Sequence, residues 1–124
     1  DGNDGDFLNS PGISYPRYLY YNELRRSDDY HQTYGATWSW LKSSLRATTK
    51  MVKDASKITI PTILFQADGD TLVRNDRQLK LAQKAPSVHV VFCPDTKHEI
   101  FNSPDEIIAP YWSRVFEFLS SNEE

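Results

Sequence analysis

The sequence predicts an α/β fold in which parallel strands alternate with covering helices. Two apolar, β-branched runs, residues 59–67 and 88–92, are typical of short strands that are buried on both faces. Each run is followed by a loop with an ionisable side chain and then by a helical pattern. The second half of the 124-residue chain is therefore predicted to run strand, helix, strand, helix.

The first part of the chain is predicted to be mostly helical. Residues 1–14 are polar and rich in Gly, Asn and Asp, which favours a flexible lead-in and a turn. Pro16 suits the first position of a helix, which should end near Asp28. Thr37 is then expected to cap a longer helix that runs to about Lys57. Its apolar stripe recurs at spacings of three and four: Trp38, Leu41, Leu45, Thr48, Val52 and Ala55.

Two further helices are predicted beside the strands. Asn75 is expected to cap the helix between them, with Gln78 placed to reach back to it. The stretch 103–106 (Ser-Pro-Asp-Glu) predicts a capping box on Ser103, with Pro104 at the first helical position and acids in the first turn.

Composition excludes several classes of function. The net charge is −3 and no basic tract is present, so a nucleic acid is not an expected partner. Cys93 is the single cysteine, which rules out an internal disulfide and fits a reducing compartment. No apolar run reaches the roughly 20 residues that span a bilayer, and no signal peptide is recognised. The predicted location is the cytoplasm, with peripheral attachment to a membrane as an alternative.

Two strands are too few for a stable parallel sheet. Their edges would be exposed, and the apolar faces of the helices need more sheet to cover. The chain also lacks an initiator Met, which is explained by processing or by its being a piece of a longer chain. The sequence thus predicts a further part of the protein, in the same or a separate chain.

Asp70 and His98 are the candidate catalytic residues. Each follows a predicted strand, and the carboxyl ends of neighbouring parallel strands meet at one edge of a sheet. A carboxylate can hold an imidazole in one tautomer while the other ring nitrogen takes a proton from a nucleophile. The alternative is that Asp70 caps a turn and His98 is simply exposed. Asp68, in an Asp-Gly turn, is a rival for the acid.

Other reactive side chains are poorer candidates. His89 lies within a strand and is expected to be a core or sheet-face residue, and His31 is expected to face solvent. The histidines lack metal-ligand spacing, and Cys93 continues a buried strand, so neither a metal site nor a thiol nucleophile is predicted. No serine has the flanking glycines of a nucleophile elbow. No cofactor is predicted. The aromatic helical half indicates ordinary helix packing, an apolar lid or acyl-chain pocket, or both together.

The residues that carry these features resemble a known family. The stretch 60–73 (Ile-Pro-Thr-Ile-Leu-Phe-Gln-Ala-Asp-Gly-Asp-Thr-Leu-Val), then His-Glu-Ile-Phe at 98–101 and a final helix, is similar to the end of an α/β hydrolase. The group is the serine-aminopeptidase-like "hydrolase 4" type, which includes lysophospholipases and monoacylglycerol lipases. Arg17 and the stretch 35–41 resemble the lid-to-helix region of its lysophospholipase branch. The similarity extends over about residues 7–119.

The resemblance implies the C-terminal portion of an α/β-hydrolase fold, preceded by a helical cap (lid) segment. Residues 1–36 would be the lead-in and the remainder of the lid, and residues 37–124 the C-terminal part of the core. Asp70 aligns with the triad acid and His98 with the triad base, while the serine and the oxyanion loop would come from an N-terminal half. Glu99 follows the histidine as the family pattern expects, as an anchor of the loop.

The implied function is that of a serine-dependent carboxylic ester hydrolase, of the lysophospholipase or monoacylglycerol lipase type, in the complete protein. The partners would be a small lipid or ester substrate and the N-terminal half. This chain alone is expected to be inactive, because an acid–base pair without a nucleophile has nothing to activate. The alternative is a non-catalytic, hydrolase-derived interaction module.

Overall fold

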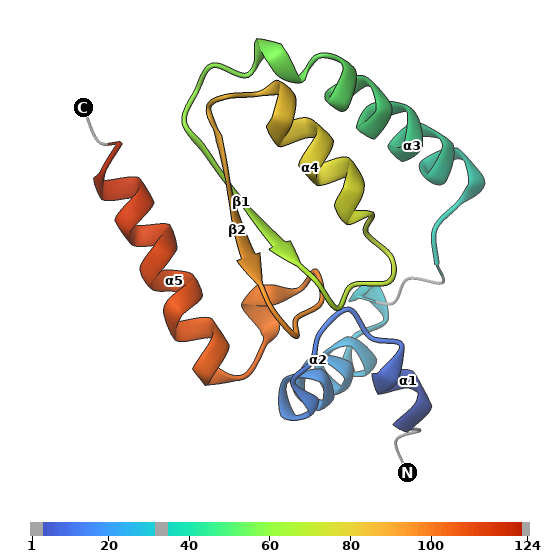
Figure 1. The fold of residues 1–124 in the computed structure, drawn as a ribbon. Coiled ribbons are helices and arrows are strands. Elements are labelled where there is room, and N and C mark those ends of the chain that lie inside the picture. The colour runs from blue at the N-terminus through green and yellow to red at the C-terminus, as the bar shows by residue number, and fades with distance from the viewer. Residues whose placement is uncertain (1–3, 32–34, 123–124) are drawn as a thin grey trace. The chain divides into compact units, whose positions relative to one another are not determined.

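The computed structural model describes residues 4–31 and 35–122 and confirms the α/β class (Figure 1). Helices and strands follow one another in the predicted order, with short 3₁₀ turns (η) between them. The elements are α1 (Asp4–Leu8), α2 (Tyr15–Ser27), η1 (Asp29–His31), α3 (Trp38–Lys53), η2 (Ala55–Lys57), β1 (Thr62–Ala67), α4 (Asn75–Lys84), β2 (Val88–Cys93), η3 (Ile100–Asn102) and α5 (Asp105–Ser120).

The two strands pair in parallel. At one end of the ladder the amide of Thr62 donates to the carbonyl of Ser87 (2.9 Å), and past the other end the amide of Asp68 donates to the carbonyl of Cys93 (3.3 Å). The residue numbers of donor and acceptor rise together, which is the mark of a parallel pair. Because α4 connects the strands, the carboxyl end of each is followed by a loop at the same edge, as the sequence predicts.

The chain forms two compact units. The first comprises Asp1–Gln32, Ala67–Val73 and Phe92–Glu124, and the second comprises Thr33–Gln66 and Arg74–Val91. The backbone passes from the second unit into the first near the end of each strand. The loops that follow both strands therefore belong to the first unit. The division into lid and core at residue 36 concerns a complete hydrolase and stays a prediction.

The apolar core lies in the second unit. Ala55, Leu81, Ala85 and Val88 are buried together, and Val52, Ile58, Leu64 and Ala82 pack against them. Helices α3 and α4 lie side by side over this core (Figure 1). Only the end of the predicted α3 stripe contributes to it, because Trp38, Leu41 and Leu45 are exposed.

The helix boundaries correct two expectations. The predicted lead-in contains α1, so it is not a flexible segment throughout, and residues 1–3 lie outside the described part. Helix α3 ends at Lys53 and a 3₁₀ turn completes the predicted stretch. Asp54 marks this end: its carboxylate accepts from the ammonium groups of Lys50 (2.7 Å) and Lys57 (3.1 Å), which come from the two sides of the break.

One of the three predicted helix caps is confirmed. The hydroxyl of Thr37 accepts from the amide of Trp40 (3.2 Å) and caps α3. Asn75 is the first residue of α4 rather than its cap, which is Arg74. Gln78 does not reach back, since its side-chain oxygen accepts from the Gln66 amide group (2.8 Å) and ties the helix to β1.

The predicted capping box at α5 is wrong, although the helix itself is present. Pro104 holds the cap position, and its carbonyl accepts from the amides of Ile107 and Ile108. Ser103 belongs instead to the end of η3, because its amide donates to the carbonyl of Ile100 (3.1 Å). Its buried hydroxyl oxygen has no hydrogen-bond partner within the described residues.

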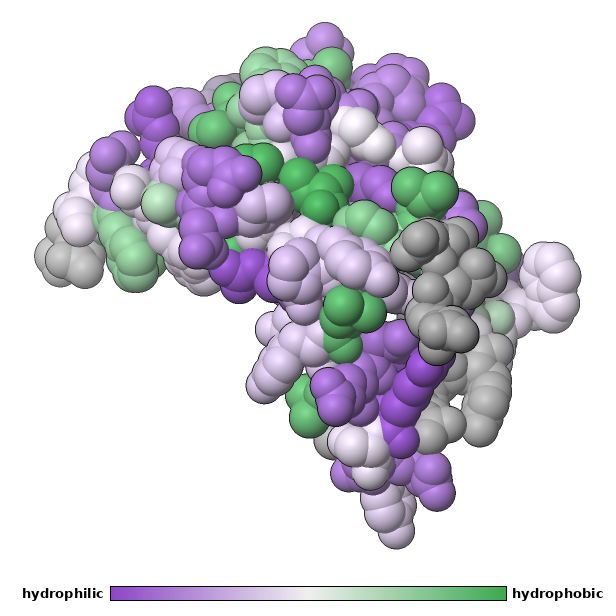
Figure 2. Space-filling model, turned by 90° about the horizontal axis from the view of Figure 1, so that it is seen from below, coloured by the Kyte–Doolittle hydropathy of each residue, from purple (hydrophilic) through white to green (hydrophobic). Residues whose placement is uncertain are grey.

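Many large apolar side chains remain at the surface. On α5, Trp112, Phe116 and Leu119 are exposed, and the rings of Trp112 and Phe116 stack at 6.0 Å between centroids. Figure 2 shows one face on which apolar residues reach the surface among hydrophilic ones. None of the helices described here is both long enough and apolar enough to cross a bilayer.

Truncation of Leu81 should test the core. Leu81 is 6% exposed, so Leu81→Ala should lower the free energy of unfolding by about 2–4 kcal/mol through lost burial and a cavity. Leu79→Ala, on the same helix but at 37% exposure, is the matched control and should cost clearly less. Urea unfolding followed by circular dichroism measures both, and equal losses would contradict this location of the core.

Candidate active site

Two loops of the first unit form the candidate site. The acid loop (residues 68–73) follows β1 and the histidine loop (residues 94–99) follows β2. They meet where the amide of Gly69 donates to the carbonyl of Thr96 (3.0 Å). A Cβ atom on Gly69 would lie 2.9 Å from that carbonyl oxygen, so the approach depends on glycine.

The Asp70 carboxylate is held from both sides. Its side chain is 2% exposed, and Oδ1 accepts from the backbone amides of Leu72 (2.7 Å) and Val73 (3.0 Å). This is the turn-capping role that sequence reasoning offered as an alternative. Oδ2 is left to contact Nδ1 of His98 at 2.5 Å. The same carboxylate therefore closes its own turn and contacts the histidine.

The environment keeps Asp70 ionised. Burial by itself raises the pKa of this carboxyl, but hydrogen bonds from the amides of Val73 and Leu72, and then from His98, outweigh it. The net pKa of Asp70 is below its usual value. A carboxylate can only accept hydrogen bonds, so the proton of the short contact is carried by Nδ1 of His98.

This arrangement leaves Nε2 of His98 as the basic nitrogen of the ring. The His98 side chain is 34% exposed, whereas its carboxylate partner is buried. A buried carboxylate that fixes the tautomer of a partly open imidazole is the geometry of an acid–base pair that serves a nucleophile.

Asp68, the rival acid, has a different partner. Its Oδ1 accepts from the amide of Asp95 (2.7 Å). Asp95 has a positive φ of 56°, a conformation that Asp tolerates better than most residues. The carboxylate of Asp68 thus holds the turn that begins the histidine loop.

Residues next to His98 also anchor its loop. Oε2 of Glu99 accepts from Nδ2 of Asn102 (3.2 Å). Sequence reasoning overlooked Lys97, whose ammonium group donates to the carbonyls of Leu8 (2.7 Å) and Ser10 (2.8 Å). No sequence pattern marks a lysine that binds main-chain carbonyls from a distant segment.

The remaining candidates do not join the site. Burial raises the pKa of the Cys93 thiol, and the negative charge of Asp68 raises it further, which opposes a role as nucleophile. His89 is exposed on β2, and the side chain of His31 lies outside the described residues. In the part of the chain that the structure describes, no cluster of His, Cys, Asp or Glu could hold a metal ion.

A hollow of about 450 Å³ lies beside the histidine loop, within the first unit. Residues of α2 and of the stretch 99–102 line it, among them Tyr18, Tyr21, Arg25, Glu99 and Phe101. Its size is in the range of small-molecule pockets, and its mixture of aromatic and polar side chains suits an amphipathic ligand.

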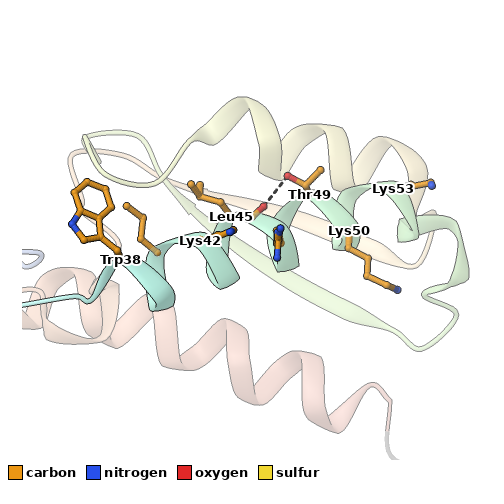
Figure 3. Close-up of a pocket in the computed structure, with 8 residues that line it drawn as sticks. Trp38, Lys42, Leu45, Thr49, Lys50 and Lys53 are labelled. Carbon is orange, nitrogen blue, oxygen red and sulfur yellow. Dashed lines mark hydrogen bonds between the residues drawn. The ribbon is translucent and has the colours of Figure 1, made fainter.

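A second, more open hollow of about 780 Å³ runs along α3 in the second unit (Figure 3). Trp38, Leu41 and Leu45 supply its apolar side, and Lys42, Arg46, Lys50 and Lys53 supply positive charge. It contains neither an acid nor a histidine among its lining residues, so it offers no acid–base chemistry.

Gly69→Ala should separate the two loops. The added Cβ would clash with the Thr96 carbonyl, so the free energy of unfolding should fall by about 1–3 kcal/mol. Gly12→Ala is the control, because its Cβ would meet the side chain of Asn102 at an ordinary 3.7 Å. That variant should stay within about 1 kcal/mol of wild type in urea unfolding. A tolerated Gly69→Ala would contradict the close approach.

The hydrogen bonds of Asp70 should make stability depend on pH. Because the pKa of Asp70 is lower in the folded state, its contribution is fully present above the unfolded value of about 3.9 and is lost as pH falls through the folded value. The difference in unfolding free energy between wild type and Asp70→Asn should shrink as the pH falls below about 4. Denaturant titrations at several pH values between about 2 and 5 measure it. A difference that grows below about pH 4 would contradict the sign of the shift.

Comparison with known proteins places this chain in a family. A probable lysophospholipase L2 from Haemophilus influenzae is 26% identical over 104 residues, which are 84% of this chain and 33% of that protein. The chain thus spans about a third of the length of the curated relative it matches. No solved structure matches it. The family model of Hydrolase_4, described as serine aminopeptidase, S33, matches residues 14–105. Since this match covers most of the chain, the protein belongs to the Hydrolase_4 family.

Proposed function

We propose that the complete protein is a serine-dependent carboxylic ester hydrolase, in which Asp70 is the triad acid and His98 the triad base. The observation that carries the proposal is the 2.5 Å contact between the buried Asp70 carboxylate and Nδ1 of His98. Membership of Hydrolase_4 supports a hydrolytic reaction. The 124 residues contain no G-x-S-x-G stretch, so the nucleophile comes from a part of the protein outside them.

The proposed reaction uses the two ring nitrogens differently. Nε2 of His98 takes the proton of the serine hydroxyl as the serine oxygen attacks the ester carbonyl. Asp70 keeps Nδ1 protonated and stabilises the imidazolium that forms. His98 then gives its proton to the leaving alcohol, and a water molecule, activated by the same nitrogen, hydrolyses the acyl-enzyme.

A lipid ester is the proposed substrate class, either a lysophospholipid or a monoacylglycerol. Two observations support it. The curated relative is a probable lysophospholipase. The hollow beside the histidine loop is lined by Tyr18, Tyr21 and Phe101 together with polar side chains, which suits an acyl chain with a polar head. Residues 1–36 would then belong to the lid of the complete fold.

Exposed apolar faces support the view that this chain is the C-terminal portion of a larger fold. Trp38 is 86% exposed and Leu45 60% on α3, and Phe116 is 61% exposed on α5. Large apolar surfaces of this kind usually pack against another part of a protein. A sheet of only two strands also leaves edges that further strands would cover.

The same exposed faces favour a second candidate, a non-catalytic interaction module derived from a hydrolase. Such a module would use its apolar helices to bind another protein and would not need a basic His98. In the catalytic candidate, His98 makes a serine reactive. In the interaction module, no serine depends on His98.

Labelling with a fluorophosphonate probe tests the catalytic proposal. The complete protein should take one label, and the 124-residue chain should take none. His98→Ala should abolish labelling, and Asp70→Asn should lower the rate of ester hydrolysis on the order of 10⁴-fold, since the histidine would lose its tautomer. His89→Ala is the control and should label normally, because His89 is an exposed residue of β2 without a role in the pair.

A complete protein that is folded but neither labels nor hydrolyses a short-chain ester would contradict the catalytic proposal. It would leave the interaction module as the better account. Labelling that survives His98→Ala would likewise remove His98 from its proposed role.

A further inference from the structure

His98 is held in place through its neighbours in the sequence. On one side, the ammonium group of Lys97, a half-buried residue, donates to the carbonyls of Leu8 (2.7 Å) and Ser10 (2.8 Å). On the other side, the amide of Glu99 donates to the carbonyl of Pro11 (3.2 Å). Both contacts reach one segment, residues 8–11, which lies about 90 positions earlier in the chain. His98 thus stands between two anchors on the same distant segment.

The Lys97 contacts are charge-assisted and involve only main-chain acceptors. Hydrogen bonds from an ammonium group are stronger than those between neutral groups. Leu8 ends α1, so its carbonyl belongs to the last turn, where carbonyls lack partners within the helix and favour a nearby cation. Since the acceptors are backbone atoms, the side chain of Lys97 is the part of this contact that a substitution can remove.

The other side of the histidine loop is fixed to the acid loop. Thr96 is 1% exposed, its hydroxyl donates to the carbonyl of Cys93 (2.8 Å), and its carbonyl accepts from Gly69. The histidine loop is therefore fixed to the acid loop through Thr96 and to residues 8–11 through Lys97 and Glu99.

We propose that Lys97 is a positioning residue for His98, and that it couples the segment before α2 to the basic nitrogen of the site. This inference rests on the proposed function, because a position matters to catalysis only if His98 acts as the base. The segment leads through Ser14 into α2, whose first backbone bond runs from the amide of Tyr18 to the carbonyl of Ser14 (2.9 Å).

Lys97→Met in the complete protein tests the proposal, because methionine keeps much of the length and removes the donors. The expected result is a loss in kcat on the order of 100-fold for a short-chain ester, with little change in KM, since a misplaced base affects the chemical step. The Nδ1 proton of His98, bound to Asp70, should give a far-downfield NMR signal in wild type that shifts or broadens in the variant. Lys97→Arg, which restores cationic donors, should recover most of the activity and the signal.

Lys84→Met is the matched control, because Lys84 is an exposed lysine in the last turn of α4. It should leave kcat and the downfield signal unchanged. A Lys97→Met variant with the wild-type signal and kcat would overturn the proposal. If Lys97→Met loses helical circular dichroism, Lys97→Gln is the deciding variant, because its side-chain amide keeps a neutral donor. An intermediate kcat of Lys97→Gln supports the proposal. A wild-type kcat and a wild-type NMR signal overturn it.

The two proposals can fail separately. If the complete protein has no esterase activity, the proposed function fails. The NMR signal of His98 still shows whether Lys97 sets the contact between His98 and Asp70, since it does not depend on turnover.

Discussion

The backbone hydrogen bond between Gly69 and Thr96 is the contact on which the candidate site depends. It joins the two loops at the ends of β1 and β2, and it leaves no room for a Cβ on the acid side. With the loops held at this distance, the Asp70 carboxylate contacts both the amides of its own turn and the imidazole of His98. The site is therefore built mostly from main-chain geometry, with few side chains committed to it.

Charge and burial then assign different chemistry to the two members of the pair. Asp70 is buried, yet the amide hydrogen bonds keep its pKa low, so it stays an anion that orients its partner. His98 is more open, as its proposed exchange of protons with a nucleophile and a leaving group requires. The large apolar side chains on α3 and α5 are exposed without such a chemical division. Their exposure is typical of surfaces that pack against another part of a protein.

Sequence periodicity was sufficient for the order of the elements from α2 to α5, because apolar repeats and β-branched runs mark helices and strands. It was less reliable at helix ends. Ser103 is a residue type typical of helix caps, but it lies at the end of the preceding 3₁₀ turn. Gln78 accepts a hydrogen bond from the side chain of Gln66 on β1 and does not reach back to the start of its own helix. Strand order predicts that the loops of Asp70 and His98 meet, but the choice of Asp70 over Asp68 as the partner of His98 comes from the structure. The contacts of Lys97 could not be predicted, because its partners are carbonyls from a segment distant in sequence.

The parallel pairing of β1 and β2 has a consequence for how this chain tolerates changes in length. A residue inserted in the crossover near α4 can be absorbed at the surface, as connections between strands commonly are. A residue inserted within either strand would move everything after it by about 3.3 Å along the sheet and turn alternate side chains to the opposite face. Asp70 and His98 would then lie beyond hydrogen-bonding distance. Insertions and deletions should therefore be tolerated between the strands and rejected within them.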